Sequence, residues 1–138
     1  MTMEDRDVPD KEWREYLRKY ASSYRMEKQA DGNWVIRCRK GGHIYLFSLY
    51  PEPRLGYFYQ SPKVSAMEKG YALSRVKGGL PEGFLHQEGD TEFSFHFPES
   101  SILRAEPPLF IRKKRILSDI QKAAMVATLK AYREGLQA

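Results

Sequence analysis

The sequence predicts an α+β fold in which an antiparallel sheet of about six strands carries an N-terminal helix, a short middle helix and a long C-terminal helix. Apolar residues recur at helical spacing near both ends of the chain and alternate with a period of two through the middle. Turn sequences rich in Gly, Pro and Asp separate the alternating runs. We therefore expect a four-strand meander followed by a hairpin, in the order α-β-β-β-β-α-β-β-α.

The length and composition of the chain predict one domain. Its 138 residues match the commonest domain size, and we find no internal repeat or low-complexity tract. We expect residues 1–9 to form a flexible N-terminus and residues 10–138 to form a single α+β domain with a basic C-terminal segment, residues 109–138. A single cysteine, an acidic N-terminus and the lack of an apolar run of about 18 residues predict a cytoplasmic protein that does not enter a membrane.

The first element is expected to be a helix over about residues 10–22. Asp7 or Asp10 is suited to cap its start, because a carboxylate accepts hydrogen bonds from the free backbone N–H groups of a first helical turn. Its apolar stripe follows the spacing i, i+3, i+4 and i+7. The stripe consists of Trp13, Tyr16, Leu17 and Tyr20.

The first two strands are expected to form a β-hairpin. They flank the turn Ala30-Asp31-Gly32-Asn33, in which Asp-Gly tolerates the positive φ of a tight turn. In the second strand, residues 34–39, alternate side chains share a face. We assign the core face to Trp34, Ile36 and Cys38.

Two further strands complete the meander. The third, residues 43–50, has apolar residues on both faces, which predicts a central strand covered on both sides. Pro51-Glu52-Pro53 forces a turn before the fourth strand, residues 55–59. That strand places Tyr57 and Tyr59 on one face and Phe58 on the other.

The middle helix is expected to begin at Ser61-Pro62, a cap followed by proline at the first helical position. Val64, Met67 and Tyr71 would form its apolar side. After it, strands over residues 84–88 and 91–97 flank Gly89-Asp90 as a second hairpin. The hairpin would be anchored by three residues on one face, Phe93, Phe95 and Phe97.

The C-terminal helix has the strongest sequence pattern. Ser118-Asp119-Ile120-Gln121 is a capping box, and a broad apolar face continues from it to the C-terminus. That face comprises Leu117, Ile120, Ala124, Met125, Leu129, Tyr132 and Leu136.

The positive charge of the chain is concentrated near its C-terminus. Residues 1–108 carry 16 basic and 16 acidic side chains, so the net charge of +5 comes from the 7 basic and 2 acidic side chains that follow. Four of the basic residues, Arg112, Lys113, Lys114 and Arg115, form one run directly before the C-terminal helix. Cations are unfavourable at a helix N-terminus, whereas phosphates bind there, so we interpret the run, helped by Lys122, as a phosphate-contacting segment. The alternative is a solvated charge run on a connector.

A second basic group is predicted on the first hairpin, where Arg37, Arg39 and Lys40 lie close to Arg25. The neighbouring strands are rich in aromatic residues, and an exposed aromatic face beside cations is how several proteins bind single strands. The alternative is that these rings belong to the core. The aromatic residues in question are Tyr45, Phe47, Tyr50, Tyr57, Phe58 and Tyr59.

Little in the sequence points to catalysis or to a cofactor. His86 and His96 flank the second hairpin and would suit the general acid and base of a small ribonuclease if they converge, although a strand histidine is usually structural. Glu88, Asp90 and Glu92 share a turn, which indicates a soluble loop rather than a cation site. Neither cysteine-histidine metal spacing nor a glycine-rich phosphate loop is present, so we predict no catalytic residue, metal or small-molecule cofactor.

Three hypotheses about function follow. The first is a nucleic-acid-binding domain that contacts phosphates through the basic C-terminal segment. The second is a protein-interaction or inhibitor module, including a homodimer, that docks through surface aromatics and the C-terminal helix. The third, and the least favoured, is a small nuclease.

Overall fold

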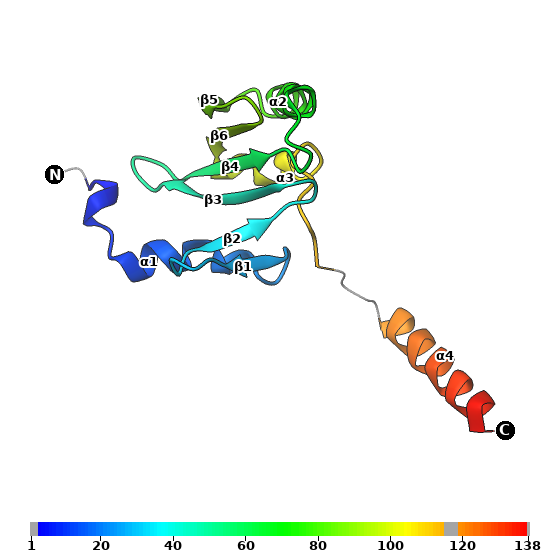
Figure 1. The fold of residues 1–138 in the computed structure, drawn as a ribbon. Helices are drawn as coiled ribbons and strands as arrows, with labels where there is room; N and C mark the ends of the chain where they lie inside the picture. The colour runs from blue at the N-terminus through cyan, green and yellow to red at the C-terminus, as the bar shows by residue number, and fades with distance from the viewer. Residues whose placement is uncertain (1–2, 115–118, 138) are drawn as a thin grey trace.

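The computed structural model describes residues 3–114 and 119–137, and it confirms the α+β fold (Figure 1). Six antiparallel strands form one sheet in the order β1-β2-β3-β4-β6-β5. The strand β6 pairs with β4 from Arg54 opposite Pro98 to Gln60 opposite Glu92, so the second hairpin continues the sheet of the meander. The strands are β1 Met26–Lys28, β2 Trp34–Arg37, β3 Gly42–Ser48, β4 Arg54–Gln60, β5 Phe84–Glu88 and β6 Glu92–Pro98.

The structure has helices in the three regions that the sequence predicts, near the N-terminus, in the middle and near the C-terminus. The N-terminal helix consists of α1 and a 3-10 extension, η2, and the middle and C-terminal helices are α2 and α4. Two short 3-10 helices and one turn of α-helix complete the chain. The bounds are η1 Asp5–Asp7, α1 Asp10–Glu15, η2 Tyr16–Tyr20, α2 Ala66–Gly79, η3 Glu99–Ser101, α3 Ile102–Ala105 and α4 Asp119–Gln137.

One face of the sheet, here called the inner face, carries the core. Phe93, Phe95 and Phe97 are buried on β6 as predicted, and Tyr57 and Tyr59 are buried beside them on β4. Helices close this core by contributing small or branched residues to the same apolar cluster. These residues are Leu17 of η2, Ala72, Leu73 and Val76 of α2, and Ala105 of α3.

A buried carboxylate joins the N-terminal helix to the far end of β6. Glu99 accepts hydrogen bonds from the hydroxyl groups of Tyr16 and Tyr20, at 2.7 and 2.8 Å, and pairs with the ammonium group of Lys19 at 2.9 Å. Nearer the start of the chain, Asp5 accepts from the backbone N–H of Leu49 at 2.7 Å. Contacts of Asp5, Tyr16, Lys19 and Tyr20 thus hold this N-terminal segment against the ends of β3 and β6.

The predicted start and apolar side of the middle helix are wrong. The helix begins at Ala66 with Ser65 as its cap, whereas Ser61 is buried and donates to Glu68 at 2.7 Å. Val64, Met67 and Tyr71 are exposed. Two stripes of this segment satisfy helical spacing, and the one with a small residue, Ala72, packs on the sheet because it lets the helix approach closely.

Two predictions about the strands also need correction. Ile36 and Cys38 are buried as expected, but Val35 on the opposite face is buried as well and Trp34 is only half-buried beneath the guanidinium of Arg18. The strand β3 is covered on its inner face alone. Its other face, the outer face of the sheet, leaves the rings of that strand half-exposed.

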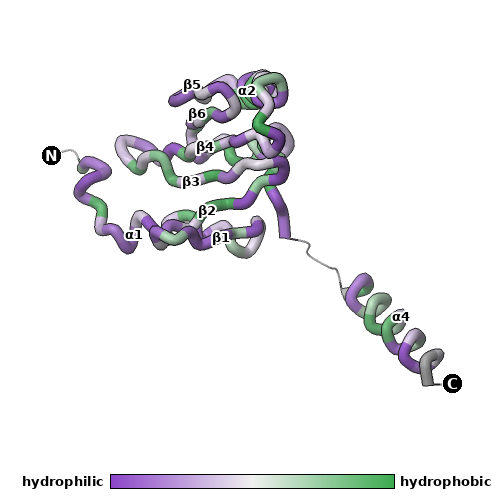
Figure 2. Tube along the Cα trace, viewed as in Figure 1, coloured by the Kyte–Doolittle hydropathy of each residue, from purple (hydrophilic) through white to green (hydrophobic). Residues whose placement is uncertain are grey.

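The C-terminal helix α4 lies apart from the sheet (Figure 1). Hydrophobic and hydrophilic residues alternate around it (Figure 2), yet its described side chains, from Ile120 to Glu134, are all exposed. The helix therefore forms as predicted, but its apolar face does not pack on the domain. Neither α4 nor any other helix in the described part of the chain is long and apolar enough to cross a membrane.

Candidate nucleic-acid interface

A short extended segment, residues 111–114, joins the sheet where β1 begins and β2 ends. It runs antiparallel to both neighbours, with Ile111 opposite Cys38 and Lys113 opposite Tyr24. The backbone N–H of Arg112 donates to the carbonyl of Arg37 at 3.0 Å, and the carbonyl of Arg112 accepts from the N–H of Arg25 at 2.8 Å. The buried side chains of Ile111, Cys38 and Tyr24 fix this segment in place.

This arrangement brings together the two basic groups that the sequence presents separately. Side chains alternate between the two faces along an extended backbone. Cys38 and Ile111 are buried on the inner face, so their neighbours Arg37, Arg39 and Arg112 lie toward the outer face. All the cations concerned are exposed. We call this group the basic surface; it comprises Arg25, Arg37, Arg39, Lys40, Arg112, Lys113 and Lys114.

Few carboxylates neutralise the basic surface. Arg37 pairs with Glu27 at 3.3 Å, and Lys113 pairs with Glu106 at 2.8 Å. The other five cations form no ion pair with any described residue. Because unpaired cations this close together repel one another, the surface has an excess of positive charge that a polyanion would neutralise.

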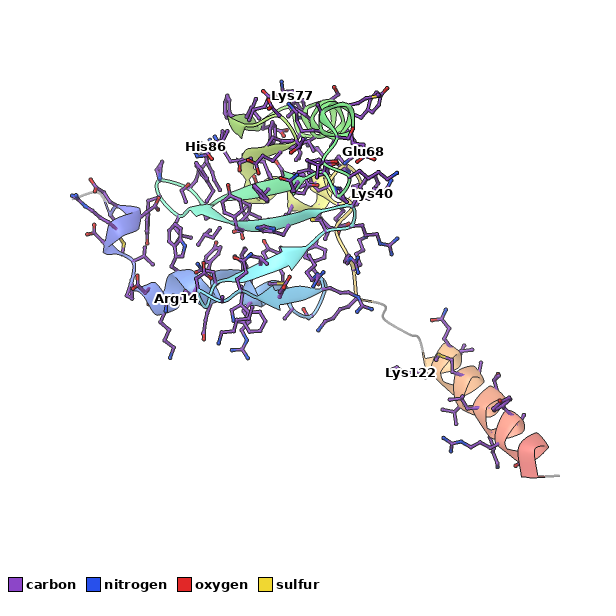
Figure 3. All side chains as sticks on the ribbon, viewed as in Figure 1. Arg14, Lys40, Glu68, Lys77, His86 and Lys122 are labelled. Carbon is purple, nitrogen blue, oxygen red and sulfur yellow. The ribbon has the colours of Figure 1, made fainter. Side chains whose placement is uncertain are left out.

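Two of the predicted basic residues stand outside this group. Lys122 lies on α4, far from Lys40 in the view of Figure 3. Arg115 falls outside the described residues. The candidate interface is therefore built from the chain before the C-terminal helix. Arg37 at the end of β2, with Arg39 and Lys40 after it, supplies as many cations as the described part of the run that begins at Arg112.

Aromatic rings continue the basic surface across the outer face. Arg37 lies opposite His43 in the strand register, and His43 lies opposite Phe58, with 5.5 Å between the two ring centres. The ring of Tyr45 covers Gly56, where an added Cβ would come within 2.2 Å of it. Only glycine at position 56 lets that ring lie flat on the sheet.

Further along the sheet, Phe47 stacks on His96 with 4.6 Å between ring centres and an interplanar angle of 5°. His86 meets the edge of Phe47 at 4.9 Å, and Phe84, which is 59% exposed, lies 5.5 Å from His96. Each of these rings is exposed or half-exposed. We call the whole group the aromatic face; it comprises His43, Tyr45, Phe47, Phe58, Phe84, His86 and His96.

The structure divides the aromatic residues that we considered for base stacking. Tyr45, Phe47 and Phe58 lie on the outer face, whereas Tyr57 and Tyr59 belong to the core. The ring of Tyr50 is exposed in the loop between β3 and β4. The period of two along β4 correctly separates Phe58 from its neighbours, but the sequence does not indicate which face a helix covers.

Two histidines of the aromatic face, His43 and His96, have pKa values below the usual range. Burial lowers the pKa of His43, and burial together with the nearby charge of Arg54 lowers the pKa of His96. Arg54 can only donate, so its contact of 3.4 Å with Nδ1 of His96 requires that nitrogen to accept. His43 and His96 therefore present uncharged aromatic rings at neutral pH and gain charge only in acid.

The groups considered for catalysis or metal binding are engaged in packing. The ring centres of His86 and His96 are 6.3 Å apart, but Phe47 packs against both. Glu88 pairs with the ammonium group of Lys69 at 2.7 Å. Among the described residues, no three His, Cys, Asp or Glu side chains gather where they could hold a metal ion. Burial raises the pKa of the Cys38 thiol to about 12, which keeps it protonated and unreactive.

Comparisons with known proteins find no match to this chain. No family model matches the sequence, no curated protein resembles it, and no solved structure matches the fold. The functional argument therefore rests on the geometry of the basic surface and the aromatic face.

Proposed function

We propose that this protein binds single-stranded nucleic acid across the basic surface and the aromatic face. The observation that carries the proposal is their continuity: Arg112, Arg37, His43 and Phe58 occupy neighbouring positions in one row across the sheet. Neighbouring strands lie about 4.8 Å apart, so cation and ring are within reach of one nucleotide.

The ligand is expected to be single-stranded because the aromatic face can stack only on exposed bases. In a duplex the base faces are covered by neighbouring base pairs, whereas single strands can splay them onto Tyr, Phe or His rings. The cations of the basic surface would bind the phosphates and supply the part of the affinity that does not depend on nucleotide sequence. Phosphate contacts and ring stacking are available to every base, so we expect weak sequence preference.

Fluorescence anisotropy with labelled oligonucleotides of about 12 nucleotides tests the proposal, since single-strand binding folds cover about 4 to 16 nucleotides. Single-stranded DNA, single-stranded RNA and a duplex are titrated at low salt. The expected result is that single strands bind more tightly than the duplex. Failure of both single strands to bind at low salt would overturn the proposal.

A pair of matched variants locates the site. Arg39→Gln/Arg112→Gln removes two unpaired cations of the basic surface, and Lys11→Gln/Lys77→Gln removes two exposed cations of α1 and α2. Both variants lower the net charge equally. We expect only the first to lose affinity, and equal losses would show that binding depends on total charge rather than on this surface.

A second candidate function, self-association through α4, is favoured by the exposed apolar residues of that helix. Ile120, Val126 and Tyr132 are 84%, 65% and 66% exposed, which is unusual for large apolar side chains on one helix. Met125, Leu129 and Tyr132 follow the four-three spacing of a coiled coil. A second copy of the same helix presents the same stripe and would cover it symmetrically.

Sedimentation velocity tests self-association. The wild-type chain is expected to sediment as a dimer at micromolar concentration, and Leu129→Glu is expected to sediment as a monomer because it places a charge in the seam. Lys130→Glu, a neighbouring change outside the seam, is the control. A wild-type chain that stays monomeric at high concentration would exclude this function.

A further inference from the structure

A pocket of about 320 Å³ lies beside the basic surface, between the end of β4, the turn before β3 and the first half of α2. Its volume is at the lower limit of the range found for small-molecule sites, which is the size of a single small ligand rather than of a polymer groove. Figure 3 labels Lys40 and Glu68, which lie near each other at this end of the sheet. The side chains that define the pocket are Lys40, Tyr59, Lys63, Glu68, Tyr71 and Arg75.

The charge inside the pocket is unbalanced. Three cations face a single carboxylate, Glu68, which already accepts from Ser61 at 2.7 Å and lies 3.9 Å from the ammonium group of Lys63. Neither Lys40 nor Arg75 forms an ion pair with a described residue. A bound anion would supply the missing partner.

One aromatic ring holds both of these cations in position. The ammonium group of Lys40 lies 4.6 Å from the centre of the Phe110 ring, and the guanidinium carbon of Arg75 lies 4.3 Å from it. Arg75 also donates through Nε to the carbonyl of Pro108 at 2.7 Å. These contacts fix the two charges before any ligand arrives, which reduces the entropy that binding would cost.

Unfavourable backbone geometry is concentrated around the same pocket. Lys40, Val64 and Phe110 have φ angles of 61°, 52° and 51°, and they are the only non-glycine residues with positive φ in the described parts of the chain. This conformation is unfavourable for any residue with a Cβ. Lys40 lines the pocket, Val64 follows Lys63 in its rim, and Phe110 supports its cations. Such strain collects at ligand sites more often than elsewhere.

We infer that this pocket binds a phosphomonoester carried by a nucleoside, at the end of the nucleic-acid strand. A terminal phosphate carries a charge of about −1.5 to −2 at neutral pH, more than an internal phosphodiester, and the pocket holds an excess of two positive charges over Glu68. The ring of Tyr71 is 68% exposed at the rim, where it can stack on the terminal base.

The pocket and the basic surface are directly connected, so this inference rests on the proposed function. Lys40 belongs to both, and the carbonyl of Phe110 accepts from the backbone N–H of Arg39 at 2.8 Å. The pocket lies on the inner side of the sheet, so a strand bound across the basic surface would pass around the sheet edge at Lys40 and reach the pocket with its end. The small volume of the pocket favours a strand end over an internal nucleotide, since the chain continues on both sides of an internal nucleotide.

Anisotropy titrations with one single-stranded sequence in three forms test the inference: 5′-phosphorylated, 3′-phosphorylated, and with hydroxyl groups at both ends. One phosphorylated form is expected to bind at least tenfold more tightly than the hydroxyl form. Lys63→Gln/Tyr71→Ala changes two exposed pocket residues and should remove that preference while the hydroxyl form still binds. Lys11→Gln/Lys77→Gln should keep the preference.

The possible outcomes separate this inference from the proposed function. Equal binding of all three forms would overturn the pocket assignment and leave the single-strand interface intact. No binding of any form would overturn both. In a separate titration, a free nucleoside monophosphate is added and the NMR shifts of the Tyr71 ring are followed. If this compound binds but a phosphate at the strand end does not increase the affinity of the strand, the pocket is assigned to a free nucleotide. That result would contradict the strand-end inference.

Discussion

The side chain of Glu106 is expected to hold the segment that carries Arg112 and Lys114 against the sheet. It accepts from the hydroxyl of Tyr24 at 2.7 Å and pairs with the ammonium group of Lys113 at 2.8 Å. Tyr24 is 3% exposed, and Glu106 is the partner of its hydroxyl. Glu106→Ala therefore leaves a buried hydroxyl without a partner and releases Lys113.

The expected destabilisation follows from these two contacts. An unpaired buried hydroxyl costs about 1–3 kcal/mol, and the loss of a largely exposed ion pair costs about 0.2–1 kcal/mol. We therefore expect Glu106→Ala to lower the free energy of unfolding by about 2–3 kcal/mol. Urea denaturation at neutral pH measures this loss. In the double variant with Tyr24→Phe, the two losses should be less than additive by about 1–2 kcal/mol.

The same contacts predict a pH dependence. Partial burial raises the pKa of Glu106, but the hydrogen bonds from Lys113 and Tyr24 outweigh burial, so the net pKa lies below its usual range. A depressed pKa stabilises the fold above the unfolded value of about 4.3, and the gain disappears as the pH falls through the folded pKa. The difference between wild type and Glu106→Ala should thus be complete at pH 7 and shrink below about pH 4.3. A loss under about 0.5 kcal/mol at pH 7, or an additive double variant, would refute this role of Glu106.

Three further predictions concern the outer face and the core. Phe58→Ala should weaken single-strand binding by about 1–3 kcal/mol without changing its salt dependence, because the variant loses a stacking ring but keeps every cation. An altered salt slope in isothermal titrations would contradict this. Affinity for single strands should rise as the pH falls below about 6.5, because His43 and His96 then begin to gain charge. Burial lowers the pKa of both histidines. An anisotropy profile that stays flat between pH 7.5 and 5 would place both histidines away from the ligand. The Cys38 thiol, with a pKa raised to about 12 by burial, should react with a thiol reagent only after the protein unfolds, and rapid reaction of the native protein would disprove its burial.

The fold could be predicted from the sequence because its strands alternate strongly and its turns are well marked. Phe93, Phe95 and Phe97 share a face in any strand, and Asp31-Gly32 fits a hairpin turn without tertiary information. The middle helix shows where this reasoning stops. Val64, Met67 and Tyr71 match helical spacing as well as the buried residues do, and only the shape of the sheet selects between the two stripes.

The basic surface could be predicted only in its parts. The sequence shows the run from Arg112 and the pair Arg37 and Arg39, and in each case a buried apolar residue, Ile111 or Cys38, lies directly beside the cations. This alternation of cations with an apolar residue predicts extended backbone in both segments, and it is the one sequence signal of their pairing. Their pairing is a long-range contact, and no local spacing encodes which strand end receives the segment.

The aromatic face and the pocket depend still more on tertiary structure. His96 and Phe47 come from β6 and β3, which β4 separates, so their stacking depends on the pairing of three strands. The pocket combines Lys40 with Arg75 through Phe110, three residues that are distant in the sequence. The positive φ of Lys40 and Phe110 has no sequence signal, because neither residue type favours it.

The salt dependence of single-strand binding tests the central claim most directly. If the five unpaired cations of the basic surface each contact a phosphate, log Kobs should fall with log salt at a slope of about −3.5, or about 100-fold in affinity between about 50 and 200 mM salt. Arg39→Gln/Arg112→Gln should reduce the slope to about −2, and Lys11→Gln/Lys77→Gln should leave it unchanged. A wild-type slope near zero, or equal slopes in all three proteins, would contradict an interface built on this surface.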